Sequence, residues 1–201
     1  MGITKQYLEV HAVVRVDNKP TIARLETEYD EDSAIVYFPI QDESFFLAVC
    51  VSKNELPEVT GIYFQSGNRV YFRATSDKLS FDELAAKTRL KPIDGWNNGE
   101  PMKSNPTNNY KFSALHFNPF PDEAYNMEYK MKLLLTELEK DRKGIKELVE
   151  SANGYISIAS YRYIDQFGGI HLDKELVKRL NDIGLEVDFD IYVGGNPLIC
   201  D

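Results

Sequence analysis

Three carboxylates alternate with apolar residues near the end of the 201-residue chain, where the sequence reads GLEVDFDIYV. Glu186, Asp188 and Asp190 are spaced by two, so on a strand they share one face, with neighbours about 7 Å apart. Carboxylates this close can perform acid–base chemistry or hold a divalent cation through oxygen ligands. The simpler interpretation is a solvated sheet face, or pairing with Arg69 and Arg73 on a neighbouring strand, because opposite charges commonly pair across strands.

The segment before these carboxylates predicts the elements that hold them. Asp173 is placed to cap a helix whose apolar residues repeat at helical spacing, and Gly184 is placed to end it. From Glu186 the apolar period changes to two, which predicts a strand with one buried face and one acidic face that also carries Tyr192. A helix that leads directly into such a strand indicates a packed helix–sheet unit whose sheet has one wet side.

A second candidate surface lies between Asp94 and Asn109, a segment rich in Asn, Gly and Pro that contains Glu100 and the only tryptophan, Trp96. We expect a long structureless loop here, and binding residues concentrate on loops that a rigid scaffold holds. Trp96 is interpreted either as an anchor for a binding partner or as a side chain that folds back onto the core.

The histidines and cysteines show no spacing typical of a metal site. His11, His116 and His171 are far apart, Cys50 lies in an apolar run, and Cys200 lies near the end of the chain. Zinc sites need three or four nitrogen or sulfur ligands, usually in short paired spacings. The sequence also has no phosphate-binding loop and no nucleophile elbow. We therefore expect no metal, no cofactor and no catalytic residue. The two cysteines do not form a disulfide framework, which favours a reducing compartment.

The formal net charge of −9 argues against nucleic-acid binding, which demands a basic face, and is compatible with a basic protein partner. A further acidic run, from Glu28 to Asp32, is interpreted as a solvated turn or as a second contact for such a partner. No stretch approaches 18 apolar residues, and the N-terminus has no apolar signal core, so we expect a cytoplasmic protein without membrane contact.

The chain divides by pattern into three parts. Residues 1–66 predict a β-meander, with one strand from Leu8 to Val16, and form either a separate unit or part of the same domain. A tight turn at residues 66–68 leads into an α+β domain over residues 67–193, and residues 194–201 are expected to be a frayed tail. The predicted fold class is α+β, a mostly antiparallel sheet with two or three helices packed on one face, preceded by the meander.

Two helices of the predicted domain have sequence signals at their ends. Ser80 and Glu83 form a capping box that begins a helix running to about Leu90. A long apolar-striped helix begins at about Asp122, and Gly144 is expected to kink it or end it.

Four segments resemble a bacterial domain-of-unknown-function family, number 4279: SFDELAAKTRL with a proline behind it, GWNNGE, LLLTELEK, and GIHLDKELVKRLNDIGLEVDFDIY. The last is the most specific, with matching residues at Gly169, Leu172, Leu180, Gly184, Asp188, Asp190 and Tyr192. The resemblance covers about residues 68–193 and leaves residues 1–66 outside. It implies an α+β fold and a cytoplasmic bacterial origin, and it brings no activity, cofactor or catalytic residue with it.

The leading functional hypothesis is a non-enzymatic protein of immunity type, which neutralises a partner toxin by occluding its active site with an acidic surface. The candidate binding residues are Trp96, Glu100, Glu186, Asp188, Asp190 and Tyr192. One alternative is a small hydrolase or lyase that uses the strand carboxylates. Another is a structural module, monomeric or homodimeric, that associates with itself through an exposed strand edge such as residues 8–16.

Overall fold

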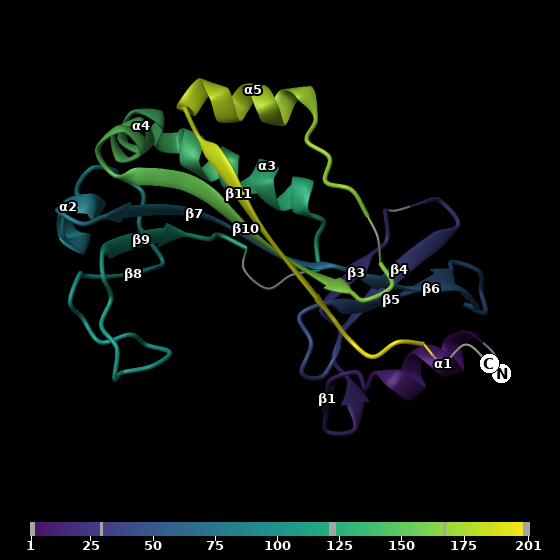
Figure 1. Ribbon diagram of the computed structural model, residues 1–201. Helices are drawn as coiled ribbons and strands as arrows, with labels where there is room; N and C mark the ends of the chain where they lie inside the picture. Colours follow the sequence, from purple (N-terminus) through teal and green to yellow (C-terminus); the bar gives the residue numbers. More distant parts are fainter. Residues whose placement is uncertain (1–2, 29, 121–123, 167, 199–201) are drawn as a thin grey trace.

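Two β-sheets form the body of the computed structural model (Figure 1), which describes residues 3–28, 30–120, 124–166 and 168–198. The first sheet is antiparallel, with strands β3 (Arg24–Glu26), β4 (Ser33–Pro39), β5 (Phe46–Ser52) and β6 (Val59–Gln65) in chain order. The second has the order β11-β10-β7-β9-β8, with bounds of β7 (Gly67–Ser76), β8 (Asp94–Trp96), β9 (Ser113–Phe117), β10 (Asn153–Tyr163) and β11 (Glu186–Gly194).

Helices cover one face of the second sheet (Figure 1). These are α3 (Met127–Leu138), α4 (Arg142–Ser151) and α5 (Lys174–Ile183), while the short α2 (Phe81–Ala85) packs beside β9. All strand pairs of the two sheets are antiparallel except β10 and β11, which are parallel and are joined through α5. The predicted class, a mostly antiparallel α+β sheet with helices on one face after a β-rich part, is confirmed.

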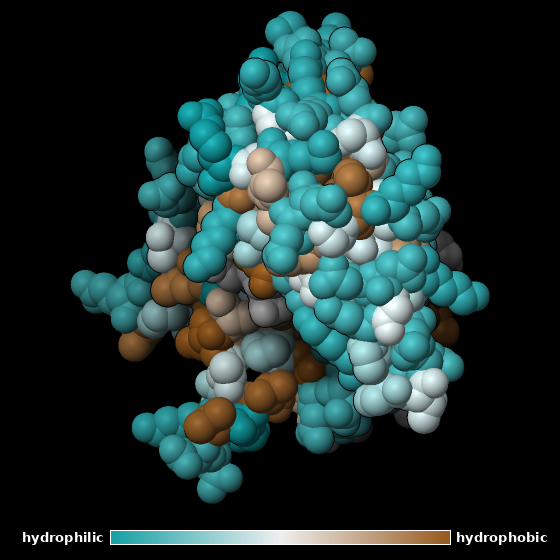
Figure 2. Space-filling model, turned by 90° about the vertical axis from the view of Figure 1, so that its left-hand side faces the viewer, coloured by the Kyte–Doolittle hydropathy of each residue, from teal (hydrophilic) through white to brown (hydrophobic). Residues whose placement is uncertain are grey.

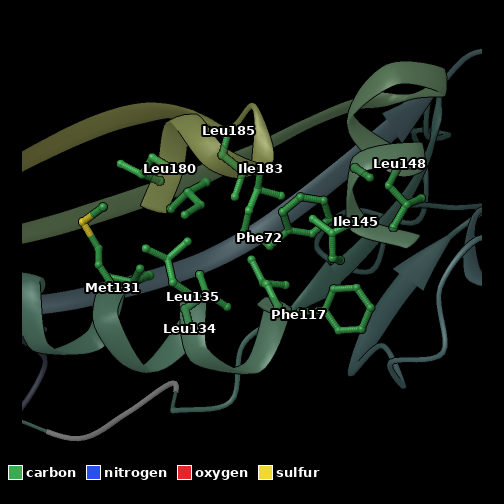
Figure 3. Close-up of a cluster of buried hydrophobic side chains, with 14 of the residues drawn as sticks. Phe72, Phe117, Met131, Leu134, Leu135, Ile145, Leu148, Leu180, Ile183 and Leu185 are labelled. Atoms are coloured by element: carbon green, nitrogen blue, oxygen red, sulfur yellow. The ribbon is translucent and has the colours of Figure 1, made fainter. Parts of the chain in front are cut away.

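The main hydrophobic core lies between these helices and the sheet (Figure 3). Leu134 and Leu135 of α3, Leu148 of α4 and Ile183 of α5 are each at most 1% exposed, and they pack against a layer of strand residues that includes Phe72. Strand residues alternate in direction, so the side chains between these buried ones point to the other face of the sheet. The helices therefore decide which face of the sheet remains open.

The α5–β11 unit forms as its sequence predicts. The Asp173 side chain accepts a hydrogen bond from the backbone N–H of Leu176 at 2.8 Å and so caps the helix. Gly184 ends it in the left-handed conformation, with φ of 77°. The capping box is also confirmed, because Ser80 N–H donates to Glu83 at 2.8 Å, although α2 ends at Ala85 and not near residue 90.

The break in the long helical segment is made by Asp141 and not, as predicted, by Gly144. A 3-10 turn (Glu139–Asp141) separates α3 from α4, and the buried Asp141 carboxylate accepts hydrogen bonds from Arg89 N–H at 2.7 Å and from the Thr88 hydroxyl at 2.9 Å. Those bonds, led by the Arg89 N–H, lower the pKa of Asp141. A Cβ at Gly144 would lie 2.7 Å from Lys87 O, so this glycine permits close packing. The predicted start at Asp122 lies outside the described residues, and α3 begins at Met127.

The prediction of a strand from Leu8 to Val16 is wrong. Helix α1 (Ile3–Val10) occupies its first part. After it, Val13 forms an isolated bridge with Ile40, and the two-residue β1 (Arg15–Val16) forms a hairpin with β2 (Lys19–Pro20). Tyr7 and His11, four residues apart, both pack on the ring of Phe64, with centroids 4.9 and 5.1 Å away. Because only a helix places residues i and i+4 side by side, this contact overrides the alternating pattern. The long strand edge that self-association was to use is therefore absent.

The predicted turn at residues 66–68 is also wrong, because the chain passes there from one sheet to the other. β6 ends at Gln65 and β7 begins at Gly67, and the two strands belong to different sheets. A Cβ at Gly67 would lie 1.6 Å from Ser44 O, so only glycine fits at this crossing.

The start of the predicted tail is packed, which contradicts the expectation of fraying; residues 199–201 lie outside the described part. Asn196 N–H donates to His11 Nε2 at 3.2 Å, and the Tyr163 hydroxyl donates to Asn196 O at 2.8 Å. Leu198 packs against the cluster that contains Phe45 and Tyr163. The two ends of the described chain thus close over one aromatic cluster.

We expect Asp141→Ala to lower the free energy of unfolding by about 2–3 kcal/mol, because it removes the α4 cap and leaves the part-buried donors at residues 88 and 89 and the buried N–H of residue 144 without an acceptor. Urea unfolding measures this change. Glu137→Ala is the matched control, since within the described ranges the Glu137 carboxylate pairs only with the exposed Lys140, and its loss should cost less than about 0.5 kcal/mol. Equal effects of the two substitutions would contradict the role assigned to Asp141.

Candidate functional site

The candidate site is the open face of the second sheet, which the helices leave uncovered. The strand registers place one row of side chains across all five strands of this face: Asp94, His116, Arg73, Tyr155 and Glu186. The segment after β8 and the β1–β2 hairpin lie on the same side of the sheets, away from α3, α4 and α5 (Figure 1). Seen from the left of that view, hydrophobic residues gather in the lower half, and the upper half is largely hydrophilic (Figure 2).

The three carboxylates of β11 form the acidic edge of this face. Glu186, Asp188 and Asp190 are all exposed and alternate with the partly buried Val187 and Phe189. Among the described residues, no hydrogen bond or ion pair engages any of the three carboxylates. A hollow of about 330 Å³ touches the first two, next to Tyr155. The structure therefore places these three predicted residues together, with their charges uncompensated.

Arg69 and Arg73 do not lie on the strand next to the carboxylates, as the sequence suggested. Both are on β7, and β10 separates β7 from β11. Two strand spacings amount to about 9.6 Å, with the side chains of β10 in between. Among the described residues, no ion pair joins either arginine to a carboxylate of β11. Arg69 instead lies over the ring of Tyr71, 5.3 Å from its centroid. The open face thus has a cationic central strand and an acidic edge that do not neutralise each other by contact.

Tyr192 continues the acidic strip and adds an aromatic surface. Tyr192 is 51% exposed, and its ring stacks on that of Tyr161 of β10, with centroids 5.1 Å apart and planes at 16°. The charge of Asp190 raises the pKa of the Tyr192 hydroxyl, so the phenol remains neutral near pH 7. The strand therefore offers a flat tyrosine pair beside its carboxylates.

Trp96 lies on the same open face as the acidic strip but at the opposite edge, on β8. It stacks on Tyr110 with centroids 4.2 Å apart and planes at 14°, and it meets His116 edge-on at 5.0 Å. Arg73 lies 5.9 Å from its ring centroid. Four strand spacings separate β8 from β11, roughly 19 Å. Trp96 thus belongs to an aromatic cluster of its own, and the structure does not bring it together with the acidic strip.

The segment after Trp96 is an ordered excursion, so the prediction of a structureless loop is wrong. Gly99 N–H donates to Tyr110 O, and Tyr110 N–H donates to Glu100 O, both at 2.8 Å. Pro101 pairs with Asn109 as an isolated bridge. The many Asn and Pro residues form turns inside this narrow excursion, which folds back along itself.

Glu100 has a structural task within the excursion. Its carboxylate accepts hydrogen bonds from Asn97 N–H at 3.0 Å and from Asn97 Nδ2 at 2.9 Å. These bonds lower the pKa of Glu100. Asn97 Oδ1 in turn accepts from Phe81 N–H at 2.8 Å, at the first turn of α2. Glu100 thus orients Asn97, and it lies apart from the carboxylates of β11.

Two residues of the face, Arg73 and His116, were missed as site candidates. His116 is 8% exposed, and its Nε2 is buried with no hydrogen-bond partner in the described part of the chain, as are Arg73 Nε and Trp96 Nε1. Burial, reinforced by the charge of Arg73, lowers the pKa of His116 to about 4, so the ring is neutral near pH 7. The alternation of Arg73 between Phe72 and Ala74 was the available signal for its outward direction.

A larger hollow of about 540 Å³ lies outside the open face, between the start of α3 and the segment after β10. Buried Asn68 and Ser160 line it, with Arg162, Glu128 and His171. His171 Nδ1 lies 3.2 Å from Glu128 Oε1, without hydrogen-bond geometry. Arg162 donates to Ser160 Oγ and Gly168 O, so its guanidinium is already engaged.

Within the described ranges, no three His, Cys, Asp or Glu side chains gather in a way that could hold a metal ion. Cys50 is a free, half-buried thiol whose pKa is raised by burial. Cys200 lies outside the described residues. None of the described helices is long and apolar enough to cross a membrane.

The fold and the site together define an α+β protein with an open, tyrosine- and arginine-rich sheet face whose edge strand is acidic. The family profile described as "Domain of unknown function (DUF4279)" matches residues 65–194, and the chain belongs to this family. The match begins at the crossing between the two sheets and ends with β11, which agrees with the resemblance found in the sequence. No curated protein and no solved structure matches the chain significantly.

We expect the low pKa of His116 to make stability depend on pH. The unfolded chain binds a proton near pH 6.5 and the folded chain only near pH 4, so stability is lost as the pH falls through this window. The loss specific to His116 is roughly 3 kcal/mol between pH 7 and pH 4. Urea unfolding at pH 7 and pH 4 should therefore show a smaller pH effect in His116→Gln than in the wild type. His171→Gln, at an exposed histidine, is the control and should keep the wild-type pH effect. A wild-type pH effect in both variants would contradict the low pKa assigned to His116.

Proposed function

We propose that this protein is a non-enzymatic binding protein that docks a basic protein partner on the open face of the second sheet. The observation that carries this proposal is the acidic strip of β11, where three exposed carboxylates lack ion-pair partners among the described residues. Exposed, uncompensated charges of one sign attract and select a partner of the opposite sign. The net charge of −9 extends the attraction beyond the strip itself.

The composition of the face supports a protein partner over a small ligand. Interfaces are enriched in Tyr, Trp and Arg, and such residues often carry most of the binding energy. Here Tyr161 and Tyr192 stack beside the carboxylates, and Arg69 lies exposed over Tyr71 on β7. The flat tyrosine pair provides contact area with little side-chain entropy to lose.

The specific form of the proposal is an immunity-type protein that neutralises a toxin by covering its active site. A basic substrate-binding cleft on the toxin would attract the carboxylates of β11 in the same way that it attracts the negative charges of the toxin's own substrate. The immunity-type proposal includes action in the cytoplasm, because such a protein protects the cell that makes the toxin.

An enzymatic alternative rests on the hollow of about 330 Å³ that Glu186 and Asp188 line with Tyr155. In that alternative a hydrolase or lyase would use the two carboxylates, about 7 Å apart along the strand, as acid and base. Their exposure favours the binding proposal, because catalytic carboxylates usually sit in recessed sites that shift their pKa. Self-association remains a further hypothesis, now without the strand edge at residues 8–16.

The test is co-expression with a basic protein encoded by a neighbouring gene, followed by pull-down at low and high salt. We expect retention that weakens with salt, and Asp188→Asn/Asp190→Asn should reduce affinity by at least about tenfold, because it removes two of the three carboxylates. The control is Glu55→Gln/Glu58→Gln, which removes the same charge from the exposed segment between β5 and β6. Equal loss in both double variants would show a non-specific charge effect, and no retained neighbour would contradict the immunity form.

A further inference from the structure

The outer edge of β11 has backbone groups without partners among the described residues. β11 is the first strand in the order of its sheet and pairs only with β10. Gly194 O accepts from Ile164 N–H at 2.9 Å, so Gly194 directs its backbone groups toward β10. In a parallel pair, successive residues direct their N–H and C=O groups to opposite sides of the strand. The outward backbone groups therefore belong to Val187, Phe189, Ile191 and Val193.

The two faces of β11 differ in chemistry, because one carries carboxylates and the other carries apolar side chains. Glu186, Asp188 and Asp190 point to the open face. The alternating residues are apolar and point to the helix side, and the last two of them lie outside the helix–sheet core: Ile191 is 48% and Val193 is 62% exposed. A segment added at this edge would meet carboxylates on one face and apolar side chains on the other.

We infer that an extended segment of the partner binds as an added strand along the outer edge of β11. This inference rests on the proposed function and specifies how its basic partner docks. The segment alternates basic and apolar residues, because a strand presents successive side chains to opposite faces. Its basic residues lie beside the carboxylates of the open face, and its apolar residues cover Ile191 and Val193. The backbone supplies affinity, and the alternation supplies specificity.

A partner segment fits this edge better than a second copy of the same chain. Two β11 strands paired edge to edge would bring their carboxylates onto one face, where like charges on opposed positions destabilise the pairing. Charged residues on an exposed edge are also a common protection against such self-pairing. The carboxylates that repel a second copy of β11 attract a basic segment.

The test uses a defined peptide, so that the natural partner need not be known. The probe is a fluorescein-labelled nine-residue peptide of alternating valine and lysine, with blocked ends, which matches the nine residues of β11. We expect saturable binding by fluorescence anisotropy to the full-length protein. A peptide of alternating valine and glutamate is the matched control and should not bind.

Ile191→Pro tests the role of the backbone. Proline removes the outward N–H of residue 191, and its ring blocks an added strand, whereas proline is tolerated on an edge strand when its missing N–H faced outward. We expect at least about tenfold weaker peptide binding with near wild-type thermal unfolding. Val193→Pro, closer to the strand end, serves the same purpose if Ile191→Pro fails to fold.

The outcomes separate this inference from the proposed function. If the proline variants bind the peptide like the wild type while Asp188→Asn/Asp190→Asn does not, the acidic face docks partners without strand addition, and the inference is wrong. Absence of any binding by the alternating peptide also overturns it, even where a basic protein partner is retained in pull-down. Peptide binding lost in both kinds of variant supports it, and a rise in the dimer fraction in place of binding would assign the edge to a second copy.

Discussion

One-sided packing of helices on the second sheet is the constraint from which the rest of this molecule follows. Side chains of α3, α4 and α5 bury the face that carries Phe72 and Ile156, both at 0% exposure. Because strand residues alternate, this burial forces Arg73, Tyr155 and the β11 carboxylates to the opposite face. A register shift of one residue in β7 or β11 would exchange the two sets, at the cost of burying charge. The core therefore fixes the composition of the open face.

The long strand β10 extends this constraint to the rest of the chain. Its first half contributes Ile156 and Ile158 to the helix–sheet core, and its last residue, Tyr163, lies in the aromatic cluster with Phe45 and Phe64. His11 and Asn196 close the same cluster from the two ends of the chain. The residues before the family match are thus packed onto the domain through the end of one of its central strands.

The sequence predicted the parts of the structure that local physical chemistry determines. Helix caps at Asp173 and Ser80, the stop at Gly184 and the alternation of β11 depend on neighbours a few residues away, and they were predicted correctly. The buried face predicted for β11 is confirmed only in its first half, because Val187 and Phe189 are partly buried whereas Ile191 and Val193 are exposed. Helix α1 was missed because its helical form depends on distant Phe64, which the pattern of residues 8–16 does not reveal. The acidic strip was likewise predictable as a face, since alternation is local.

Which strands are neighbours was not predictable from a single sequence. Arg69 and Arg73 were expected beside the carboxylates, but the sheet order inserts β10 between them, so charges that would have cancelled remain apart. The same order puts Trp96 at the far edge of the face. Strand order is set by how the helices that connect successive strands pack over long range. The periodicity of the sequence does not encode this packing.

The exposure of the β11 carboxylates limits what they contribute to a complex. Exposed ion pairs typically stabilise by 0–1 kcal/mol, so even three of them supply only a few kcal/mol and lose part of that in salt. Their larger effects are on the rate of encounter and on the choice of partner. Tight binding must then come from groups that become buried: the tyrosine pair at Tyr161 and Tyr192, exposed Ile191, and the outward backbone groups of β11, which no other described strand pairs with. An acidic strip on a free strand edge suits such a division, because charge selects the segment and the backbone holds it.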